Sequence, residues 1–241
     1  MIDLQNLRVI AFDADDTLWD CQSFFFNVEH QYCELLAAYG DEDHISQELF
    51  KTETANMEEL GYGCKAFTLS LVENAIKVSK GKIDASYLLE IQELGRSLLR
   101  LPATPLPEVE ETLKAMKESG RFRMVVFTKG ELQDQQNKMR RSGLVPLFDD
   151  IIVVADKTPE AYAKLCNRFC IDISELLMVG NSFKSDVEPV LQLGGYAVHI
   201  PFEYMWAHEH AETYEHPQLK TITHFSELLS LLGIDSDTEY I

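Results

Sequence analysis

Basic residues are scarce in this sequence. Its 241 residues include 21 lysines and arginines against 40 aspartates and glutamates, so the formal net charge at pH 7 is −19. Nucleic-acid backbones and anionic membranes attract proteins through positive charge, and this chain carries a large excess of the opposite sign. The composition therefore argues against nucleic-acid polymers and membranes as partners and favours small molecules or cations.

Long apolar runs and ordered cysteine patterns are also missing. No stretch reaches the roughly 18 consecutive apolar residues that span a bilayer, and the first residues do not resemble a secretory signal. The five cysteines are dispersed, odd in number and without C-x-x-C spacing, which indicates neither a disulfide framework nor a zinc site. We therefore expect a protein of the reducing cytoplasm. The cysteines are Cys21, Cys33, Cys64, Cys166 and Cys170.

Apolar residues nevertheless make up 46% of the chain, and many of them fall in short runs. Each run stops at polar residues or glycine, as buried parallel strands do where they deliver functional groups to one edge of a sheet. Segments with helical periodicity lie between the runs, and one of them shows Leu132, Gln136 and Met139 at helical spacing. This alternation predicts a doubly wound α/β fold with a mainly parallel, Rossmann-like sheet. The expected strands cover residues 7–12, 122–128, 151–155, 176–180 and 196–200.

The alternation is interrupted between residues 21 and 100, where only helical periodicity is found. Apolar residues recur at helical spacing in four stretches, which predicts four helices inserted into the α/β unit. A proline-rich stretch, residues 102–107, then marks the return to the α/β unit, since proline disfavours helix in the residues before it. We expect an α/β core formed by residues 1–20 and 101–241 and a helical cap domain formed by residues 21–100.

Three carboxylates follow the first expected strand. Asp13, Asp15 and Asp16 precede Thr17 in the sequence Asp-Ala-Asp-Asp-Thr. Carboxylates this close repel one another, which raises their pKa values or requires a cation. An acidic loop that caps a helix would explain the same residues, because Asp and Thr are common N-cap residues. The segment alone is compatible with both a reactive site and a cap.

Groups suited to phosphate and magnesium chemistry follow the other expected strands. Thr128 ends the second strand, and Lys129 with Gly130 opens the next helix, where backbone N–H groups can bind an anion. Lys157 follows the third strand, and Asp186 follows the fourth as a hard oxygen ligand of the kind that Mg²⁺ prefers. Each residue taken singly also fits a helix cap or a solvated charge. Their coincidence at strand ends favours a phosphate and metal site.

In their order along the chain, these residues resemble the four motifs of the haloacid dehalogenase superfamily, whose members are mostly phosphatases. Asp13 to Thr17 is similar to the first motif, Thr128 to the second, Lys157 to the third, and residues 180–186 to the fourth. The resemblance covers nearly the whole chain. The inserted helices resemble the cap that one subfamily places between its first two motifs.

The resemblance implies a mechanism and a cofactor. Asp13 is expected to attack phosphorus and form an aspartyl-phosphate, while Asp15, protonated at first, gives a proton to the leaving oxygen and later activates water. Mg²⁺ is expected to be held by the Asp13 carboxylate, the Asp15 backbone carbonyl and Asp186. The expected phosphate-binding residues are Thr128, Lys129 and Lys157, and the expected supporting residues are Asp16, Thr17 and Asn181.

Two residues depart from the family pattern. Asn181 stands where many members carry an acid, which lowers the negative charge of the site and favours a water-mediated or supporting role over direct metal ligation. Asp16 replaces a glycine that is common in the first motif. We expect this substitution to matter little, since the backbone at this position need not be left-handed.

Several activities are compatible with such a site. Asp15 favours phosphoryl transfer over dehalogenation, which needs neither Mg²⁺ nor an acid at that position. A phosphomutase or other phosphotransferase would keep the same residues, so only the frequency of phosphatases in the family favours hydrolysis. Signalling receivers are shorter and lack the helical insertion, and a non-catalytic binding protein would not require the intact set of motifs. We therefore predict a Mg²⁺-dependent phosphatase acting on a small phosphorylated metabolite.

Weaker signals lie elsewhere in the chain. The His-Glu-His sequence at residues 208–210 lacks the i, i+4 spacing of zinc-binding helices, so we expect no metal site there. Cys166 and Cys170 have that spacing but share an apolar helix face, which favours core packing. Residues 201–206 could line the site or pack on the core. The loop around Tyr62, flanked by Gly61 and Gly63, could contact the substrate.

Overall fold

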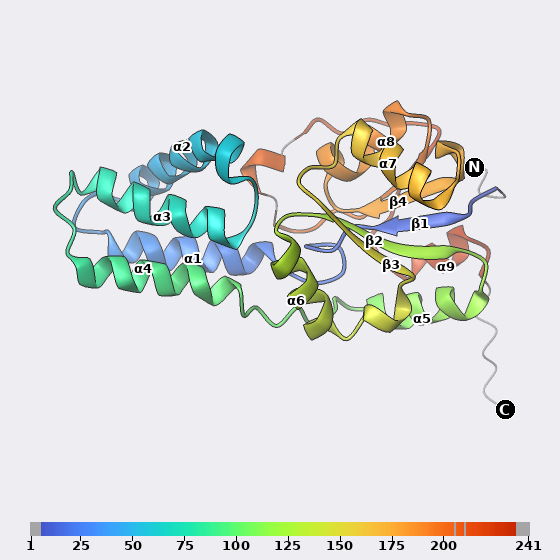
Figure 1. Ribbon diagram of the computed structural model, residues 1–241, viewed down its shortest axis with the longest axis horizontal. Helices are drawn as coiled ribbons and strands as arrows, with labels where there is room; N and C mark the ends of the chain where they lie inside the picture. Colours follow the sequence, from blue (N-terminus) through green and yellow to red (C-terminus); the bar gives the residue numbers. More distant parts are fainter. Residues whose placement is uncertain (1–5, 205, 210, 235–241) are drawn as a thin grey trace.

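The computed structural model describes residues 6–204, 206–209 and 211–234. A six-stranded parallel sheet runs through it in the order β3-β2-β1-β4-β5-β6 (Figure 1). The strands are β1 Val9–Phe12, β2 Arg123–Lys129, β3 Asp150–Val154, β4 Leu176–Gly180, β5 Tyr196–His199 and β6 Leu219–Thr221. The first five lie where strands were predicted. The short β6 was not predicted, because two of its three residues are polar.

Side chains alternate along the strands between two hydrophobic cores. In β1, Ile10 and Phe12 belong to one core, whereas Val9 and Ala11 belong to the other. Helices cover both faces of the sheet, so neither face of a central strand meets water (Figure 1). Burial on both faces explains why these strands appear in the sequence as continuous apolar runs. The covering helices are α5 (Val109–Ser119) and α9 (Glu227–Leu231) on one face and α7 (Pro159–Phe169) and α8 (Glu188–Gln192) on the other.

Four helices form the insertion, which lies to the left of the sheet in Figure 1. Their apolar faces meet in a third hydrophobic core. There the Tyr32 hydroxyl donates to the Leu71 carbonyl (3.0 Å) and accepts a hydrogen bond from the Asn74 amide (2.8 Å). Gly95 permits close packing of two of the helices, because a Cβ there would lie 2.2 Å from Thr68 Oγ1. The helices are α1 Gln22–Leu35, α2 Glu42–Leu60, α3 Cys64–Val78 and α4 Ala85–Leu98.

The two chain segments that connect the insertion to the sheet lie side by side. The Leu106 N–H donates to the Leu18 carbonyl (2.9 Å), and Trp19 forms a bridge with Pro105. The predicted fold class, a parallel α/β sheet with an inserted helical cap, is confirmed, whereas the exact domain limits stay a prediction. Among the helices of the described residues, none combines the length and apolar character needed to cross a membrane.

Candidate active site

The carboxyl ends of neighbouring strands bring the predicted site residues together. Phe12 of β1 pairs with Val126 of β2 on one side and Val179 of β4 on the other, so the residues that follow these strands share one edge. A single cavity at this edge is lined by residues from all four predicted motifs. Its position fits the general rule that ligands of open α/β sheets bind outside the carboxyl ends of the strands. These motif residues are Asp13, Thr128, Lys157 and Asp186.

Lys157 lies between the carboxylates of Asp13 and Asp186. Its Nζ forms an ion pair with Asp13 and lies 2.6 Å from Asp186 Oδ1. All three side chains are buried. Burial outweighs the nearby Lys157 charge and raises the pKa of Asp13 to about 7, and burial also raises the pKa of Asp186. Two buried carboxylates thus share one ammonium, so the group carries excess negative charge when both acids are ionised.

Gly180 allows Asp186 to approach the end of β4. A Cβ at Gly180 would lie 2.2 Å from Asp186 Oδ2, so a larger residue would displace that carboxylate. The Ser182 N–H donates to the same oxygen (3.0 Å) just before a π-helical turn, Phe183–Val187. The glycine and the turn together place the Asp186 carboxylate beside Lys157.

The carboxylate of Asp15 is held by side chains that the sequence did not identify. Lys138 Nζ lies 2.7 and 2.9 Å from its two oxygens, and Gln135 Nε2 and Trp19 Nε1 each donate at 2.8 Å. Burial opposes ionisation of Asp15, but the Lys138 charge and these hydrogen bonds outweigh it and lower its pKa. The contacts of the protein alone therefore favour the proton on Asp13. The expected assignment, with Asp13 ionised and Asp15 protonated at first, refers to the enzyme with its cation and stays a prediction.

Gln135 and Lys138 belong to α6 (Leu132–Ser142), the helix that follows β2. The helix predicted from Leu132, Gln136 and Met139 is confirmed, but of these three residues only Met139 is buried. The helix turns polar side chains toward the site instead. The sequence does contain an i, i+4 pair of opposite charges in this helix, Asp134 and Lys138, and their charged atoms lie 3.4 Å apart. Pairs with this spacing usually lie on a solvated helix face, so the pair did not predict burial. The buried residues of α6 are Asp134, Gln135, Lys138, Met139 and Ser142.

Asp16 has a left-handed backbone, with φ of 63°. The expectation that this position need not be left-handed is therefore wrong. The Asp16 carboxylate accepts hydrogen bonds from the N–H groups of Cys21 and Gln22, each at 2.8 Å, and such local bonds are what allow an aspartate to occupy this conformation. Burial raises the pKa of Asp16 to about 7. Asp16 thus shapes the turn that leads from β1 into the insertion.

Asn181 is connected to the first motif through the Thr17 hydroxyl. The Asn181 N–H donates to Thr17 Oγ1 (3.0 Å), and this oxygen lies 3.1 Å from Asn181 Oδ1 and 3.2 Å from Asp13 Oδ2. Because a hydroxyl carries one proton, it can donate to only one of these two acceptors at a time. The geometry suits the supporting role predicted for Thr17 and Asn181, which stays a prediction.

The end of β2 differs in part from the predicted phosphate cradle. Thr128 is buried and lines the cavity. The Gly130 N–H, however, donates to the Val154 carbonyl (3.1 Å), so this N–H is not available to an anion. The Lys129 ammonium also has protein partners, because it pairs with Glu209 and donates to Ser185 Oγ (3.0 Å). A phosphate contact of Lys129 stays a prediction.

Glu209 is a residue of the cavity wall that the sequence did not predict. Its carboxylate pairs with the Lys129 ammonium and accepts hydrogen bonds from the hydroxyls of Ser182 and Ser185, the latter at 2.8 Å. Burial opposes ionisation of Glu209, but the Lys129 charge and these hydrogen bonds lower its pKa. The Lys129 ammonium also lies 4.4 Å from the centre of the Tyr62 ring. Glu209 therefore fixes the position of Lys129, the last residue of β2.

These groups surround a cavity of about 190 Å³ between the sheet edge and the insertion. The Tyr62 and Trp206 rings line it and meet edge to face with their centroids 5.9 Å apart. Tyr204 also lines the cavity, so the segment 201–206, whose place was left open, contributes to its wall. Contact between the Tyr62 loop and a substrate stays a prediction.

The remaining sequence signals have mixed outcomes. His208 stacks on Phe50 of α2 with ring centroids 4.3 Å apart, and His210 lies outside the described residues. Within the part of the chain that the structure describes, no group of three His, Cys, Asp or Glu residues is arranged to hold a metal ion. Cys166 is buried as predicted, but Cys170 is exposed because it ends α7 in a left-handed conformation (φ 52°).

Comparisons with known proteins agree with this geometry. A family model for a hydrolase, haloacid dehalogenase-like hydrolase, matches residues 7–194. The chain belongs to this family. The predicted family and the predicted enzyme class, a hydrolase, are thereby confirmed.

Individual relatives of this haloacid dehalogenase-like hydrolase cover most of its length. Glyceraldehyde 3-phosphate phosphatase of Methanocaldococcus jannaschii is 25% identical over 205 residues, or 80% of this chain and 85% of the relative. N-acylneuraminate-9-phosphatase of Rattus norvegicus is 24% identical over 210 residues, or 79% and 81% of the two chains. A solved haloacid dehalogenase-like hydrolase from Xanthomonas campestris has a TM-score of 0.85 at 32% identity, with 95% and 93% of the chains covered.

Proposed function

We propose that the protein is a Mg²⁺-dependent phosphatase that hydrolyses a small phosphomonoester through an aspartyl-phosphate on Asp13. The observation that carries the proposal is the buried group of Asp13, Lys157 and Asp186 at the cavity, with Asp15 beside it. A nucleophilic carboxylate, an ammonium for the phosphoryl oxygens and a second acid are the groups that this transfer requires. The two relatives named above, both phosphatases, support the same activity.

The residues around Asp13 fit a divalent cation. Asp13 and Asp186 supply hard oxygen donors, and among the described residues Lys157 is the one cation that pairs with them. Two buried carboxylates facing one ammonium leave the group short of one positive charge when both acids are ionised. Mg²⁺ held by Asp13, Asp186 and the Asp15 backbone carbonyl would supply that charge, keep Asp13 ionised and offset negative charge on the phosphoryl oxygens.

The side chains divide the reaction into two steps. In the first, Asp13 attacks phosphorus, Thr128 and Lys157 bind the phosphoryl oxygens, and Asp15 gives a proton to the leaving oxygen. Entry of a phosphate dianion adds negative charge beside Asp15, which raises its pKa toward proton uptake. In the second step, ionised Asp15 takes a proton from the water that attacks the aspartyl-phosphate. The ion pair with Lys138 favours this ionised form.

The test is the release of inorganic phosphate from a generic aryl phosphate by the purified full chain. We expect turnover with Mg²⁺, loss of turnover in EDTA, and no activity in Asp13→Asn. Asp15→Asn should slow turnover by about 10²–10⁴-fold. Asp20→Asn, in which the substituted acid lies outside the cavity lining, is the matched control and should remain active. Metal-independent turnover or an active Asp13→Asn variant would refute the proposal.

A further inference from the structure

Every lysine that lines the cavity already contacts a carboxylate of the protein. Among the described residues of the lining there are three lysines, nine aspartates and glutamates, and no arginine or histidine. The cavity is therefore strongly acidic away from the phosphate site, and its positive charges are satisfied internally. The pairs are Lys157 with Asp13 and Asp186, Lys138 with Asp15 and Asp134, and Lys129 with Glu209.

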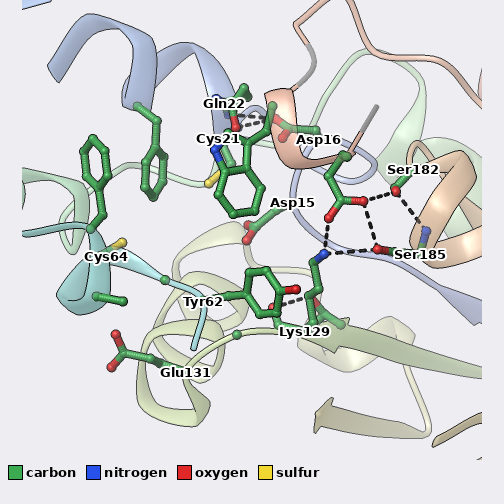
Figure 2. Close-up of a pocket in the computed structure, with 18 of the residues that line it drawn as sticks. Asp15, Asp16, Cys21, Gln22, Tyr62, Cys64, Lys129, Glu131, Ser182 and Ser185 are labelled. Carbon is green, nitrogen blue, oxygen red and sulfur yellow. Dashed lines mark hydrogen bonds and ion pairs between the residues drawn. The ribbon is translucent and has the colours of Figure 1, made fainter. Parts of the chain in front are cut away.

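Lys129 is the one of these three lysines that contacts neither Asp13 nor Asp15. Its ammonium lies between the Tyr62 ring, which belongs to the insertion, and Ser185, which belongs to the sheet domain (Figure 2). If the phosphoryl group binds beside Asp13 and Lys157, the leaving group extends toward the insertion, on the side where Lys129 meets Tyr62. A substrate carboxylate in that part of the cavity would form an ion pair with Lys129 if the lysine were free.

Glu209 pairs with this ammonium, and hydrogen bonds hold the Glu209 carboxylate in place. Two serine hydroxyls, from Ser182 and Ser185, donate to the carboxylate oxygen that does not pair with Lys129. The Glu209 side chain is 13% exposed and that of Lys129 is 17% exposed, so water screens the pair only weakly. Glu209 thus stands where the carboxylate of an acidic substrate would bind.

The segment that carries Glu209 is anchored on the insertion as well as on the sheet domain. Trp206 meets Tyr62 edge to face, and His208 stacks on Phe50 of α2. His208 and Trp206 also contact each other, with ring centroids 4.6 Å apart. These aromatic contacts on one side and the serine hydroxyls on the other keep Glu209 at Lys129 without help from a ligand.

We propose that Glu209 makes the site selective for phosphomonoesters with a small, neutral, hydroxylated leaving group and against those whose leaving group carries a carboxylate. This inference rests on the proposed phosphatase function. An acidic leaving group would meet like charge and a lysine already neutralised, whereas hydroxyl groups can donate to the carboxylate of Glu29 on the insertion side of the cavity. A cavity of about 190 Å³ has room for a leaving group of a few carbon atoms.

The test compares glycerol 3-phosphate with 3-phosphoglycerate, which share a carbon chain and a phosphate ester but differ in a hydroxymethyl or carboxylate end. For the wild-type protein with Mg²⁺ we expect kcat/KM to be at least about tenfold higher for glycerol 3-phosphate, the size of one close like-charge contact. Glu209→Gln keeps the side-chain volume but releases Lys129. It should raise kcat/KM for 3-phosphoglycerate by about tenfold or more and change that for glycerol 3-phosphate little.

Two further variants separate this effect from a general loss of negative charge. Glu131→Gln also removes a cavity-lining carboxylate, but one that pairs with Lys65, so it should leave the ratio of the two kcat/KM values unchanged. Adding Lys129→Met to Glu209→Gln should abolish the gain. Equal wild-type kcat/KM for both esters, or equal changes of the ratio in Glu209→Gln and Glu131→Gln, would overturn the inference while leaving the phosphatase proposal intact. Absence of turnover of aryl phosphate as well would overturn both.

Discussion

Replacement of Lys138 by methionine removes the cation that holds Asp15 while nearly preserving side-chain volume. The Lys138 ammonium lies 2.7 and 2.9 Å from the Asp15 oxygens and 3.4 Å from Asp134 Oδ2, and its side chain is 3% exposed. Without it, Asp15 keeps hydrogen bonds from Gln135 and Trp19 but loses every charged partner that it contacts. The two remaining neutral hydrogen bonds then restrain the orientation of the Asp15 carboxylate less tightly.

The loss of stability can be bounded from this geometry. Removing one partner of a buried ion pair typically costs about 3–5 kcal/mol, and we expect the lower end because the Asp15 side chain is 26% exposed. The Asp15 pKa is lowered in the folded state, so the group stabilises the protein above its unfolded pKa, and this contribution is lost as pH falls through the folded pKa. The difference between wild type and Lys138→Met should therefore be largest near neutral pH and shrink in acid.

The decisive assay is the dependence of kcat/KM on the leaving group of a series of aryl phosphates. A nitrophenolate departs without a proton, whereas a phenol or an alcohol needs Asp15 in place to protonate it. Lys138→Met should thus lose little activity on nitrophenyl phosphate, and its loss should approach about 10²-fold or more on phenyl phosphate. Lys138→Arg should retain most activity. Equal losses across the series would show that Lys138 does not position Asp15.

Two predictions concern the insertion. Burial and the nearby Glu29 raise the pKa of Glu53 from 4.5 to about 8, so the folded state binds this proton more tightly and stability from the group is lost as pH rises between these values. In urea unfolding, the free energy of unfolding of Glu53→Gln relative to wild type should rise by roughly 2 kcal/mol between about pH 5 and about pH 9. Glu58→Gln, on the exposed side of the same helix, should show no such rise. Gly95→Ala places a Cβ 2.2 Å from Thr68 Oγ1 and should lower the unfolding free energy by about 1–3 kcal/mol. Thr68→Ala should restore part of that loss, because it removes Oγ1 and Cγ2 but leaves the Cβ of residue 68, which would lie 2.8 Å from the new Cβ. A double variant as unstable as Gly95→Ala would contradict the packing explanation.

The sheet and the order of its site residues could be predicted because both depend on short-range signals. A strand buried on both faces must be apolar throughout, and the residues after parallel strands must share an edge, so Asp13, Thr128 and Lys157 followed from the positions of the apolar runs. The burial of Lys138 could not be predicted in this way. Its contact with Asp15 spans 123 positions, and within α6 its i, i+4 spacing from Asp134 is that of an ordinary surface pair.

The role of Glu209 is even harder to predict from local sequence. The residue follows β5 in a segment without helical or strand periodicity, and its partner Lys129 is 80 positions away. Its effect depends on contacts with Ser182, Ser185 and the aromatic side chains of the insertion, all of which exist only in the folded chain. The motifs at the strand ends therefore carry the chemistry that we propose. We assign the choice of leaving group to Glu209, which lies outside these motifs. Exchange of Glu209 should accordingly change which esters are hydrolysed without changing the dependence of turnover on Asp13.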